Sequence, residues 1–244
     1  MDSYNQFADI YDTLMGDVDY DAWFSYIRSL MGVRKSILEC ACGTGQMTLR
    51  LAKHYSDIVG CDISTKMLDV ASRNLRNSGL RATLMNIDMR ALDVFKERFD
   101  AVVAVCDAVN YLTCKNDVKR FFKAAYKALK SGGAIMFDVS SLYKLKEVIG
   151  NNTFAEDEGD CAYIWKNDWD DIKRLQTMDL TFFKRVGEQF ECFRELHLQR
   201  GHSKTELIDW LTECGFCDIS VYEAFSKETP NDCSERLQFV AYKV

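Results

Sequence analysis

The chain has 244 residues, of which 48% are hydrophobic, so it can hold one large α/β domain, alone or with a modest insertion. Its formal net charge is −6 at pH 7. A nucleic-acid-binding protein needs a basic face that neutralises phosphates, so this charge argues against a nucleic-acid partner and favours a small-molecule substrate.

The N-terminal segment 1–6 has no basic region followed by an apolar stretch, and no apolar run approaches the roughly 18 residues that span a bilayer. We therefore expect no export signal, no membrane association and a cytoplasmic location. The ten cysteines are scattered through segments that otherwise have the character of core, which favours reduced thiols over a disulfide framework.

An aromatic amphipathic helix is predicted over Tyr20–Met31, as a lid over the top of a sheet. The chain then alternates short apolar runs with amphipathic stretches. The runs predict strands at Ser36–Cys40, Ile58–Cys61, Ala82–Ile87, Ala101–Cys106 and Ala134–Val139. The stretches predict helices at Gln46–His54, Thr65–Asn77 and Asp117–Lys130, the last stopped by Ser131-Gly132-Gly133. This alternation indicates a parallel sheet with helices on both faces.

The pattern changes after Val139. Period-2 alternation predicts about three antiparallel strands, at Cys161–Trp169, Arg174–Phe183 and Gln189–Leu198. A helix follows at Lys204–Cys214, capped by Ser203 and stopped by Gly215, and closing strands follow at Phe216–Phe225 and Glu235–Lys243. We therefore divide the chain into an α/β domain, 1–140 and 203–244, with an N-terminal helical lid, and a docked β-rich insertion, 141–202, which caps the substrate.

A glycine loop, Glu39-Cys40-Ala41-Cys42-Gly43-Thr44-Gly45, ends the first predicted strand and opens a helix. Glycines there let the backbone turn sharply and approach a ligand, with helix N–H groups pointing at it. Asp62 comes 17 residues after Gly45, at the end of the next strand, roughly where a ribose-binding carboxylate is found.

Two residues near this loop discriminate between nucleotide cofactors. A dinucleotide fingerprint needs a third glycine at position 48, where this chain has Thr48. The carboxylate of Glu39 would repel a pyrophosphate and favour a cationic ligand. S-adenosyl-L-methionine has a sulfonium, an ammonium and no phosphate, so the charges favour it over a dinucleotide.

Later loops add polar and apolar side chains at the same predicted sheet edge. Asp88 follows the third strand, where it would accept a hydrogen bond from an adenine amino group, and Met89 would pack on the ring. The segment 106–111 follows the fourth strand and would face the transferred methyl group. Ligands of such sheets bind beyond the carboxyl ends of the strands, so the four loops are expected to converge on one cleft.

These ordered motifs resemble those of the class I S-adenosylmethionine-dependent methyltransferases. The matching segments are Leu38–Gly45, Val59–Ser64 with Met67-Leu68, Asp88–Arg90 and Phe99–Val102. The whole chain is similar to small stand-alone bacterial methyltransferases related to the sugar-amine N-methyltransferases, through 7–12, 107–111, the β-rich insertion and 234–237.

The resemblance implies a Rossmann-like, seven-stranded, mostly parallel sheet with an antiparallel β cap. It implies that Tyr11, with Trp23 nearby, closes over the methionyl end of the cofactor, whose product is S-adenosyl-L-homocysteine. The other implied cofactor contacts are Glu39, Gly43 and Gly45 for the amino-acid portion, Asp62 for the ribose, Asp88 and Met89 for adenine, and Ile63, Met67 and Cys106.

Methyl transfer from a sulfonium is an in-line displacement, so the enzyme must align the acceptor, exclude water and remove a proton from a nitrogen or oxygen nucleophile. The candidate catalytic residues are Asp107, Tyr111 and His197. Each of these residues also has a purely structural interpretation. Asp107 would orient a backbone turn, Tyr111 would pack as an aromatic side chain, and His197 would be a strand residue paired with a neighbouring acid. His202, beside the helix cap, is expected to be exposed, and Arg200-Gly201-His202 departs from the arginine, small and aromatic pattern of related enzymes.

The leading interpretation is methyl transfer to a small acceptor, with nitrogen slightly preferred over oxygen. The alternatives are an RNA or protein methyltransferase, against which the acidic charge and the lack of an Asn-Pro-Pro-Tyr motif argue, and a non-catalytic cofactor-binding protein. No metal site is predicted, because the Cys214 and Cys217 pair straddles a helix end and has no second pair. The oligomeric state is left open.

Overall fold

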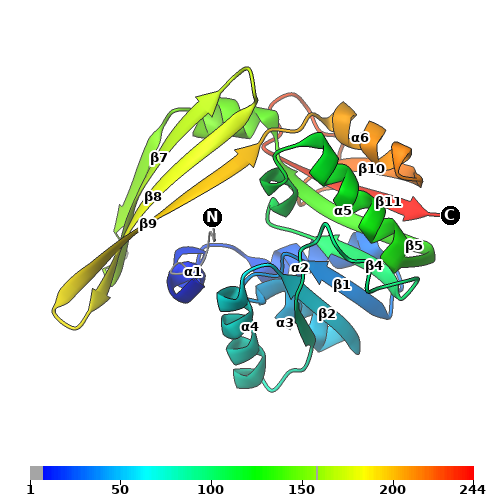
Figure 1. Ribbon diagram of the computed structural model, residues 1–244, viewed down its shortest axis with the longest axis horizontal. Helices are drawn as coiled ribbons and strands as arrows, with labels where there is room; N and C mark the ends of the chain where they lie inside the picture. Colours follow the sequence, from blue (N-terminus) through cyan, green and yellow to red (C-terminus); the bar gives the residue numbers. More distant parts are fainter. Residues whose placement is uncertain (1–7, 158) are drawn as a thin grey trace.

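Two separate β-sheets organise the structure, a seven-stranded sheet and a four-stranded sheet that projects from it (Figure 1). The computed structural model describes residues 8–157 and 159–244. Residues 1–7, which include Phe7 of the segment 7–12 noted above, lie outside the described residues.

The larger sheet has the strand order β10-β11-β5-β4-β1-β2-β3. Its strands are β1 (Ser36–Cys40), β2 (Asp57–Asp62), β3 (Thr83–Asn86), β4 (Phe99–Ala104), β5 (Leu129–Ser140), β10 (Phe216–Glu223) and β11 (Arg236–Lys243). The strands from β3 to β5 pair in parallel, and β11 pairs antiparallel with both β5 and β10. This arrangement confirms the predicted seven-stranded, mostly parallel sheet.

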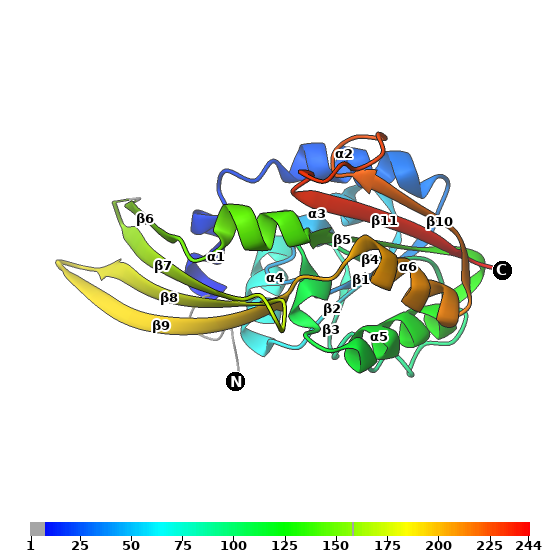
Figure 2. The ribbon, with the colours of Figure 1, turned by 90° about the horizontal axis from the view of Figure 1, so that it is seen from above.

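Helices cover both faces of this sheet (Figure 2). One face carries α2 (Tyr20–Met31) and α3 (Gln46–His54), and the other carries α5 (Lys115–Ala128) and α6 (Lys204–Glu213). In β1, Ile37 packs in the cluster that contains Ile27 of α2, whereas Leu38 packs with Phe121 of α5. Successive strand residues point to opposite faces, so an almost wholly apolar strand is what a sheet covered on both sides requires.

Two of the predicted boundaries that the structure corrects concern β5 and β4. The segment Ser131–Gly133 does not stop a helix: α5 ends at Ala128 because Leu129 is already extended and begins β5. The segment lies inside β5, where the register with β4 shifts and Gly132 has a φ of +72°. The strand predicted over Ala101–Cys106 ends earlier, at Ala104, and Cys106 has left the extended region with a φ of +60°.

The four-stranded sheet lies between β5 and α6 in the chain. Its strands, in spatial order, are β6 (Thr153–Asp157), β7 (Cys161–Asp170), β8 (Leu175–Val186) and β9 (Gln189–Arg200), all antiparallel. The prediction of about three strands missed β6, because all five of its residues are exposed and leave no alternation to detect. The π-helix η2 (Lys144–Ile149) connects β5 to this sheet. The domain division at 141 and 203 stays a prediction.

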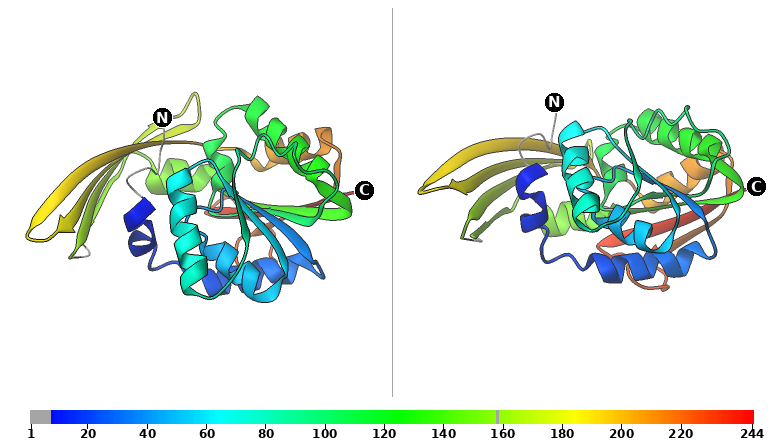
Figure 3. Two further views of the ribbon diagram at one scale, coloured as in Figure 1. Left: turned by 60° about the horizontal axis from the view of Figure 1, so that its bottom comes forward. Right: turned by 90° about the horizontal axis from the view of Figure 1, so that it is seen from below.

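One face of the four-stranded sheet, here called the inner face, curves toward α1 (Ala8–Leu14) and α4 (Thr65–Asn77) (Figure 3). Tyr163, Phe182 and Phe193 are cross-strand neighbours on it and pack in one cluster with residues of both helices. By the two-residue period of a strand, Glu195, His197 and Gln199 of β9 lie on the same face as Phe193. The inner face is thus apolar near the hairpin tip and polar near the larger sheet.

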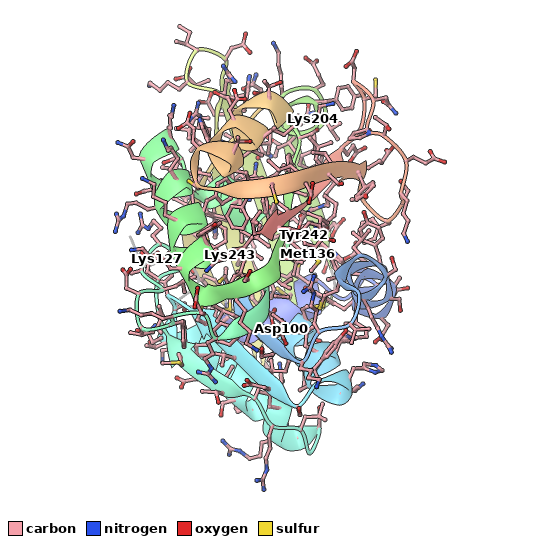
Figure 4. The ribbon with its side chains drawn as sticks, turned by 90° about the vertical axis from the view of Figure 1, so that its right-hand side faces the viewer. Asp100, Lys127, Met136, Lys204, Tyr242 and Lys243 are labelled. Atoms are coloured by element: carbon pink, nitrogen blue, oxygen red, sulfur yellow. The ribbon has the colours of Figure 1, made fainter. Side chains whose placement is uncertain are left out.

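At the end of the larger sheet seen in Figure 4, charged side chains form hydrogen bonds that hold the sheet together. Asp100 accepts hydrogen bonds from the backbone N–H groups of Lys35 and Ser36, both at 2.9 Å, and from Lys130. The Lys243 ammonium donates to the carbonyl of Leu129 at 2.7 Å. These polar groups are used to hold the sheet, which leaves the opposite, carboxyl end as the place to look for a site.

Candidate active site

A cavity of about 370 Å³ lies at the carboxyl ends of β1, β2, β3 and β4, and all four following loops line it. This volume is within the range of small-ligand sites. The predicted site residues that line it are Tyr11, Gly43, Asp62, Ile63, Met67, Asp88, Met89, Cys106 and Tyr111. The predicted residues that do not are Trp23, Glu39, Gly45, Asp107 and His197. Most of the predicted set therefore converges on one edge of the sheet.

The glycine loop after β1 turns through the left-handed region, with φ values of +53° at Ala41, +53° at Gly43 and +81° at Gly45. The two glycines differ in what surrounds them. A Cβ on Gly43 would meet nothing within 4 Å, so its backbone is open to a ligand. A Cβ on Gly45 would lie 3.0 Å from the Cβ of Ala71, so Gly45 lets α3 and α4 approach each other.

Asp62, at the end of β2, is held by the backbone on both sides. One carboxylate oxygen accepts from the N–H of Gly43 at 2.9 Å, and the other accepts from the N–H of Ser64 at 2.8 Å. Burial raises the pKa of this carboxyl, and the backbone hydrogen bonds oppose that rise. Asp62 therefore joins the loops after β1 and β2 while it lines the cavity.

Glu39 lies beneath the cavity, not on its wall, and its side chain is fully buried. The Thr48 hydroxyl donates a hydrogen bond to the carboxyl group of Glu39 at 2.5 Å. Burial raises the pKa of Glu39 to about 8, the Thr48 hydrogen bond opposes this, and nearby Asp62 adds to it. With this pKa Glu39 carries a proton at neutral pH, so the negative charge expected of it is absent, and the residue does not line the cavity.

Asp88 lines the cavity with its carboxylate already engaged. It accepts from the backbone N–H of Arg90 at 2.8 Å and from the Arg90 guanidinium at 2.6 Å. The same guanidinium donates to Asp117 at 2.6 Å. Arg90 thus lies between two acids, and its charge is compensated twice.

Asp107 is placed away from the cavity by a strained turn, since both Cys106 and Asp107 have positive φ. Its carboxylate accepts from Arg236 at 3.1 Å and from the side-chain amide of Gln199 at 2.5 Å. Arg236 also forms an ion pair with the fully buried Asp138. In this arrangement Asp107 joins β9 to β11 and does not face the cavity.

Tyr111 and His197 come together although 86 residues separate them. Tyr111 lines the cavity from the short helix η1 (Ala108–Tyr111), and its hydroxyl lies 3.3 Å from Nδ1 of His197 on the inner face. Nε2 of His197 is 3.6 Å from a carboxylate oxygen of Glu195. Burial lowers the pKa of His197 to about 4, so its ring is neutral at neutral pH.

Of the two aromatic residues expected over the methionyl end, only Tyr11 lines the cavity. Trp23 is buried in α2, where its ring packs edge-on against Phe225 at 5.3 Å and beneath the Arg236 guanidinium. The helix α2, expected as a lid over the top of the sheet, packs on one face of it, and its action as a lid stays a prediction. The helix α1 reaches the cavity through Tyr11.

Sequence reasoning missed Asp12, which fastens α1 to the site. Its carboxylate accepts from the Thr44 hydroxyl at 2.6 Å and from the side-chain amides of Gln46 and Asn74, both at 3.0 Å. Asp12 thus links α1 to the glycine loop and to α4. The only signal was its place in the segment 7–12, which gave no partner.

Other sequence expectations can be compared directly. His202 is buried and packs edge-on against Trp210 at 5.7 Å, so the expectation of exposure is wrong; burial lowers its pKa to about 4. All ten cysteines are free thiols. Within the described residues, no group of three or more His, Cys, Asp and Glu side chains could hold a metal ion, and no helix is both long and apolar enough to cross a membrane.

The charges at the cavity fit a cationic cofactor without phosphates. The charged side chains among the described lining residues are Asp62, Asp88 and Arg90, and Arg90 is neutralised by two acids. No cation is therefore left there to hold a pyrophosphate, while the Asp62 carboxylate favours a sulfonium and an ammonium. These residues fit S-adenosylmethionine.

Comparisons with known proteins agree with this chemistry. A family model described as a methyltransferase domain matches residues 37–133. The chain is 38% identical over 240 residues to the Bacillus subtilis protein named "Putative methyltransferase YqeM", covering 98% of this chain and 97% of that protein. It is 31% identical over 137 residues to dTDP-3-amino-3,4,6-trideoxy-alpha-D-glucopyranose N,N-dimethyltransferase of Streptomyces venezuelae, covering 54% of this chain and 56% of that protein.

The fold is also similar to that of a crystal structure of an S-adenosylmethionine-dependent methyltransferase from Clostridium acetobutylicum. The TM-score is 0.89 at 32% sequence identity, and the likeness covers 98% of both chains. The likeness extends over both sheets, since it spans almost the whole chain. On sequence and structure together, the chain belongs to the S-adenosylmethionine-dependent methyltransferases.

Proposed function

We propose that this enzyme transfers a methyl group from S-adenosylmethionine to a nitrogen or oxygen atom of a small acceptor bound between the cavity and the inner face. The observation that carries this proposal is the contact of Tyr111, on the cavity wall, with His197 of the inner face at 3.3 Å. The cavity and the inner face therefore meet at one point, where an acceptor can reach the methyl end of the cofactor.

We assign the cofactor contacts as follows. Asp62 would hold the ribose hydroxyls, because its two oxygens are fixed by backbone N–H groups and retain further lone pairs. Asp88 and Met89 would flank adenine, Gly43 would lie beside the amino-acid portion, and Tyr11 would cover the methionyl end. When bound, the cofactor supplies an electrophilic methyl group on a positively charged sulfur.

The protein's own part is alignment and water exclusion. Met67, Ile87 and Leu112 give the cavity an apolar wall, which lowers the local water content around the reacting atoms. Tyr111 would touch the acceptor, with His197 behind it. We assign Asp107 to positioning, because Arg236 and Gln199 occupy its carboxylate.

An amine nitrogen is the preferred acceptor atom in this proposal. A relative over half of the chain carries an amino-sugar N,N-dimethyltransferase name. The net charge of −6 supports a small acceptor over a nucleic acid. We also propose that the enzyme works in the cytoplasm, which its free thiols support and which fractionation of cells that produce the tagged chain would test.

Calorimetry with S-adenosylmethionine, S-adenosylhomocysteine and NAD tests the cofactor assignment. We expect micromolar binding of the first two and none of NAD; binding of NAD alone would overturn the proposal. Release of S-adenosylhomocysteine, measured across amines, sugar nucleotides and phenols, then identifies the acceptor. Asp209→Asn, on the exposed side of α6, is the matched control that should leave both measurements unchanged.

A further inference from the structure

The four-stranded sheet, from here on the small sheet, is bonded to η1 where the chain enters it and where the chain leaves it. The chain departs from the large sheet at Ser140, the last residue of β5, and returns after Arg200, the last residue of β9. Asn110 of η1 is fully buried between these two residues. Its Nδ2 donates to the Ser140 carbonyl at 3.0 Å and to the Arg200 carbonyl at 2.9 Å, and its Oδ1 accepts from the Ser140 N–H at 3.0 Å. We call Ser140 and Arg200 the root of the small sheet.

The pairing of the large sheet explains why a side chain can bond to the backbone of Ser140. The pairing of β4 with β5 ends at Ala104 and Phe137, so the last residues of β5 extend beyond β4, while β11 covers the other edge. The side-chain amide of Asn110 meets both backbone groups of Ser140 beyond that end. An amide has two N–H donors and an acceptor oxygen, which match two carbonyls and one N–H. A flipped amide would set oxygen against oxygen at both carbonyls, so the partners fix its orientation.

The residue that follows Asn110 is Tyr111, which lines the cavity and lies 3.3 Å from His197. The helix η1 is one short turn, so fixing the side chain of Asn110 also restricts the backbone that carries Tyr111. The bonds of Asn110 at the root go to backbone atoms, so they do not depend on the rotamers of Ser140 and Arg200. A shift of β9 relative to β5 must therefore either break one of these bonds or carry Asn110, and with it Tyr111, along.

The chain segments next to the root pack closely on each other. A Cβ on Gly201 would lie 2.5 Å from Cδ2 of Leu142 and 3.2 Å from the ring of Trp169, so a side chain at this position would not fit. The N–H of Gly201 also donates to the carbonyl of Arg174 at 2.9 Å. The root is thus a close-packed joint, and a displacement there is transmitted to its neighbours because packed side chains leave little free space to absorb it.

We propose that Asn110 is a positioning residue that couples the cavity wall to the small sheet. When the cofactor settles Tyr111 in one place, Asn110 passes this restriction through the root to β9. This inference rests on the proposed function, because it concerns the residue that we place beside the acceptor, and it adds how the cavity and the inner face are kept in register. Coupling of this kind is reciprocal, so a ligand that fixes the inner face also changes the affinity for the cofactor.

Amide hydrogen exchange of the full-length protein, with and without saturating S-adenosylhomocysteine, tests the coupling. None of the residues of β9, all of which the structure describes, lines the cavity, so direct contact with the ligand does not protect them. In the wild type we expect the ligand to slow exchange in residues 196–200 about threefold. In Asn110→Ala this slowing should be lost, while slowing in the loop around Asp62 remains. Unchanged exchange of 196–200 in the wild type, or the same slowing in folded Asn110→Ala, overturns the inference.

Exchange without ligand separates this role from a merely structural one. Asn110→Ala should raise exchange about tenfold in residues 109–112 and 198–202 and leave β1 and β2 unchanged, because the lost hydrogen bonds are local. A uniform rise over both sheets contradicts the inference. Thermal unfolding checks that the variant folds, and Asn110→Ser, judged by the same two measurements, replaces a variant that does not.

The matched control is Asn152→Ala. The exposed side chain of Asn152 donates to the carbonyl of Val148 at 3.0 Å, in the segment that connects β5 to the small sheet, so its loss should leave both measurements unchanged. Absence of cofactor binding in calorimetry would refute the proposed function alone, because the local rise in exchange is measured without ligand.

Discussion

The cofactor edge of the large sheet and the inner face of the small sheet hold their polar side chains by different means. At the cofactor edge, Asp62 is fixed by backbone N–H groups of its own and the adjacent loop. On the inner face, His197 and Gln199 are fixed by side chains of distant elements, Tyr111 and Asp107. The first geometry depends on local loop conformation, whereas the second depends on how the two sheets dock. Perturbing the docking should therefore disturb the acceptor side more than the cofactor side.

The largest effect is expected from Arg236→Met, because Arg236 compensates the fully buried Asp138 and also holds Asp107. Removing one partner of a buried ion pair typically costs about 3–5 kcal/mol. For a chain of this size that corresponds to a fall in Tm of about 10 °C in thermal unfolding. The variant should also loosen the junction of β9 with the large sheet.

The control for this prediction is Lys127→Met. Lys127 pairs with Asp93, and both side chains are more than half exposed, so its loss should cost less than about 1 kcal/mol. Lys127 lies on α5, at the end of the molecule seen in Figure 4. Similar Tm values for the two variants would contradict the role given to Arg236.

The second prediction concerns the cofactor edge alone. Asp62→Ala removes the acceptor of two backbone hydrogen bonds and the proposed partner of the ribose hydroxyls. Hydrogen bonds to a charged group contribute about 1.5–3 kcal/mol each, so calorimetry should show S-adenosylmethionine binding weakened about 100-fold. Binding within threefold of wild type would remove Asp62 from the site.

Much of the fold could be predicted because it follows from local pattern. The predicted helices at 20–31, 46–54 and 65–77 agree with α2, α3 and α4, whose caps and apolar periodicity are local signals. The boundary at Leu129 could not be predicted, because an extended residue directly after a helix gives no composition signal. Strand β6 could not be predicted either, since all of its residues are exposed and its sequence shows no alternation of apolar and polar residues that would indicate pairing with β7.

The candidate site divides in the same way. Gly43, Asp62 and Asp88 could be found because each lies at or just after the end of a parallel strand, and such strands end at one edge of the sheet. The partners of Asp107 could not, because Arg236 is 129 residues away and meets it only through the pairing of β5 with β11. Side-chain to side-chain contacts across such distances require the tertiary structure.

The third prediction uses the buried acid beneath the cofactor edge. Burial raises the pKa of Glu39 from its ordinary value of 4.5 to about 8. At pH values between these two, Glu39 keeps its proton in the folded protein and loses it in the unfolded chain. The folded state then binds more protons, so the free energy of unfolding falls as pH rises, by at most about 1.4 kcal/mol per pH unit. Urea unfolding should therefore show Glu39→Gln gaining roughly 2 kcal/mol on wild type between pH 6 and 7.5. Parallel pH dependences would show that Glu39 does not titrate in this range.

The smallest effect is expected at Asp12, where the two regions meet, because α1 packs against α4 and the inner face together. Asp12→Ala loses three part-buried hydrogen bonds to the glycine loop and α4, at a net cost of about 1–2 kcal/mol. Amide hydrogen exchange in α1 should rise about tenfold, and S-adenosylmethionine affinity should fall by a similar factor, because Tyr11 is carried by the same helix. Asp21→Ala is the matched control: Asp21 pairs with Arg50 but its side chain is 75% exposed, so exchange in α1 should be unchanged. Faster exchange in α1 with unaltered affinity would show that Asp12 only docks the helix and that cofactor binding does not depend on it.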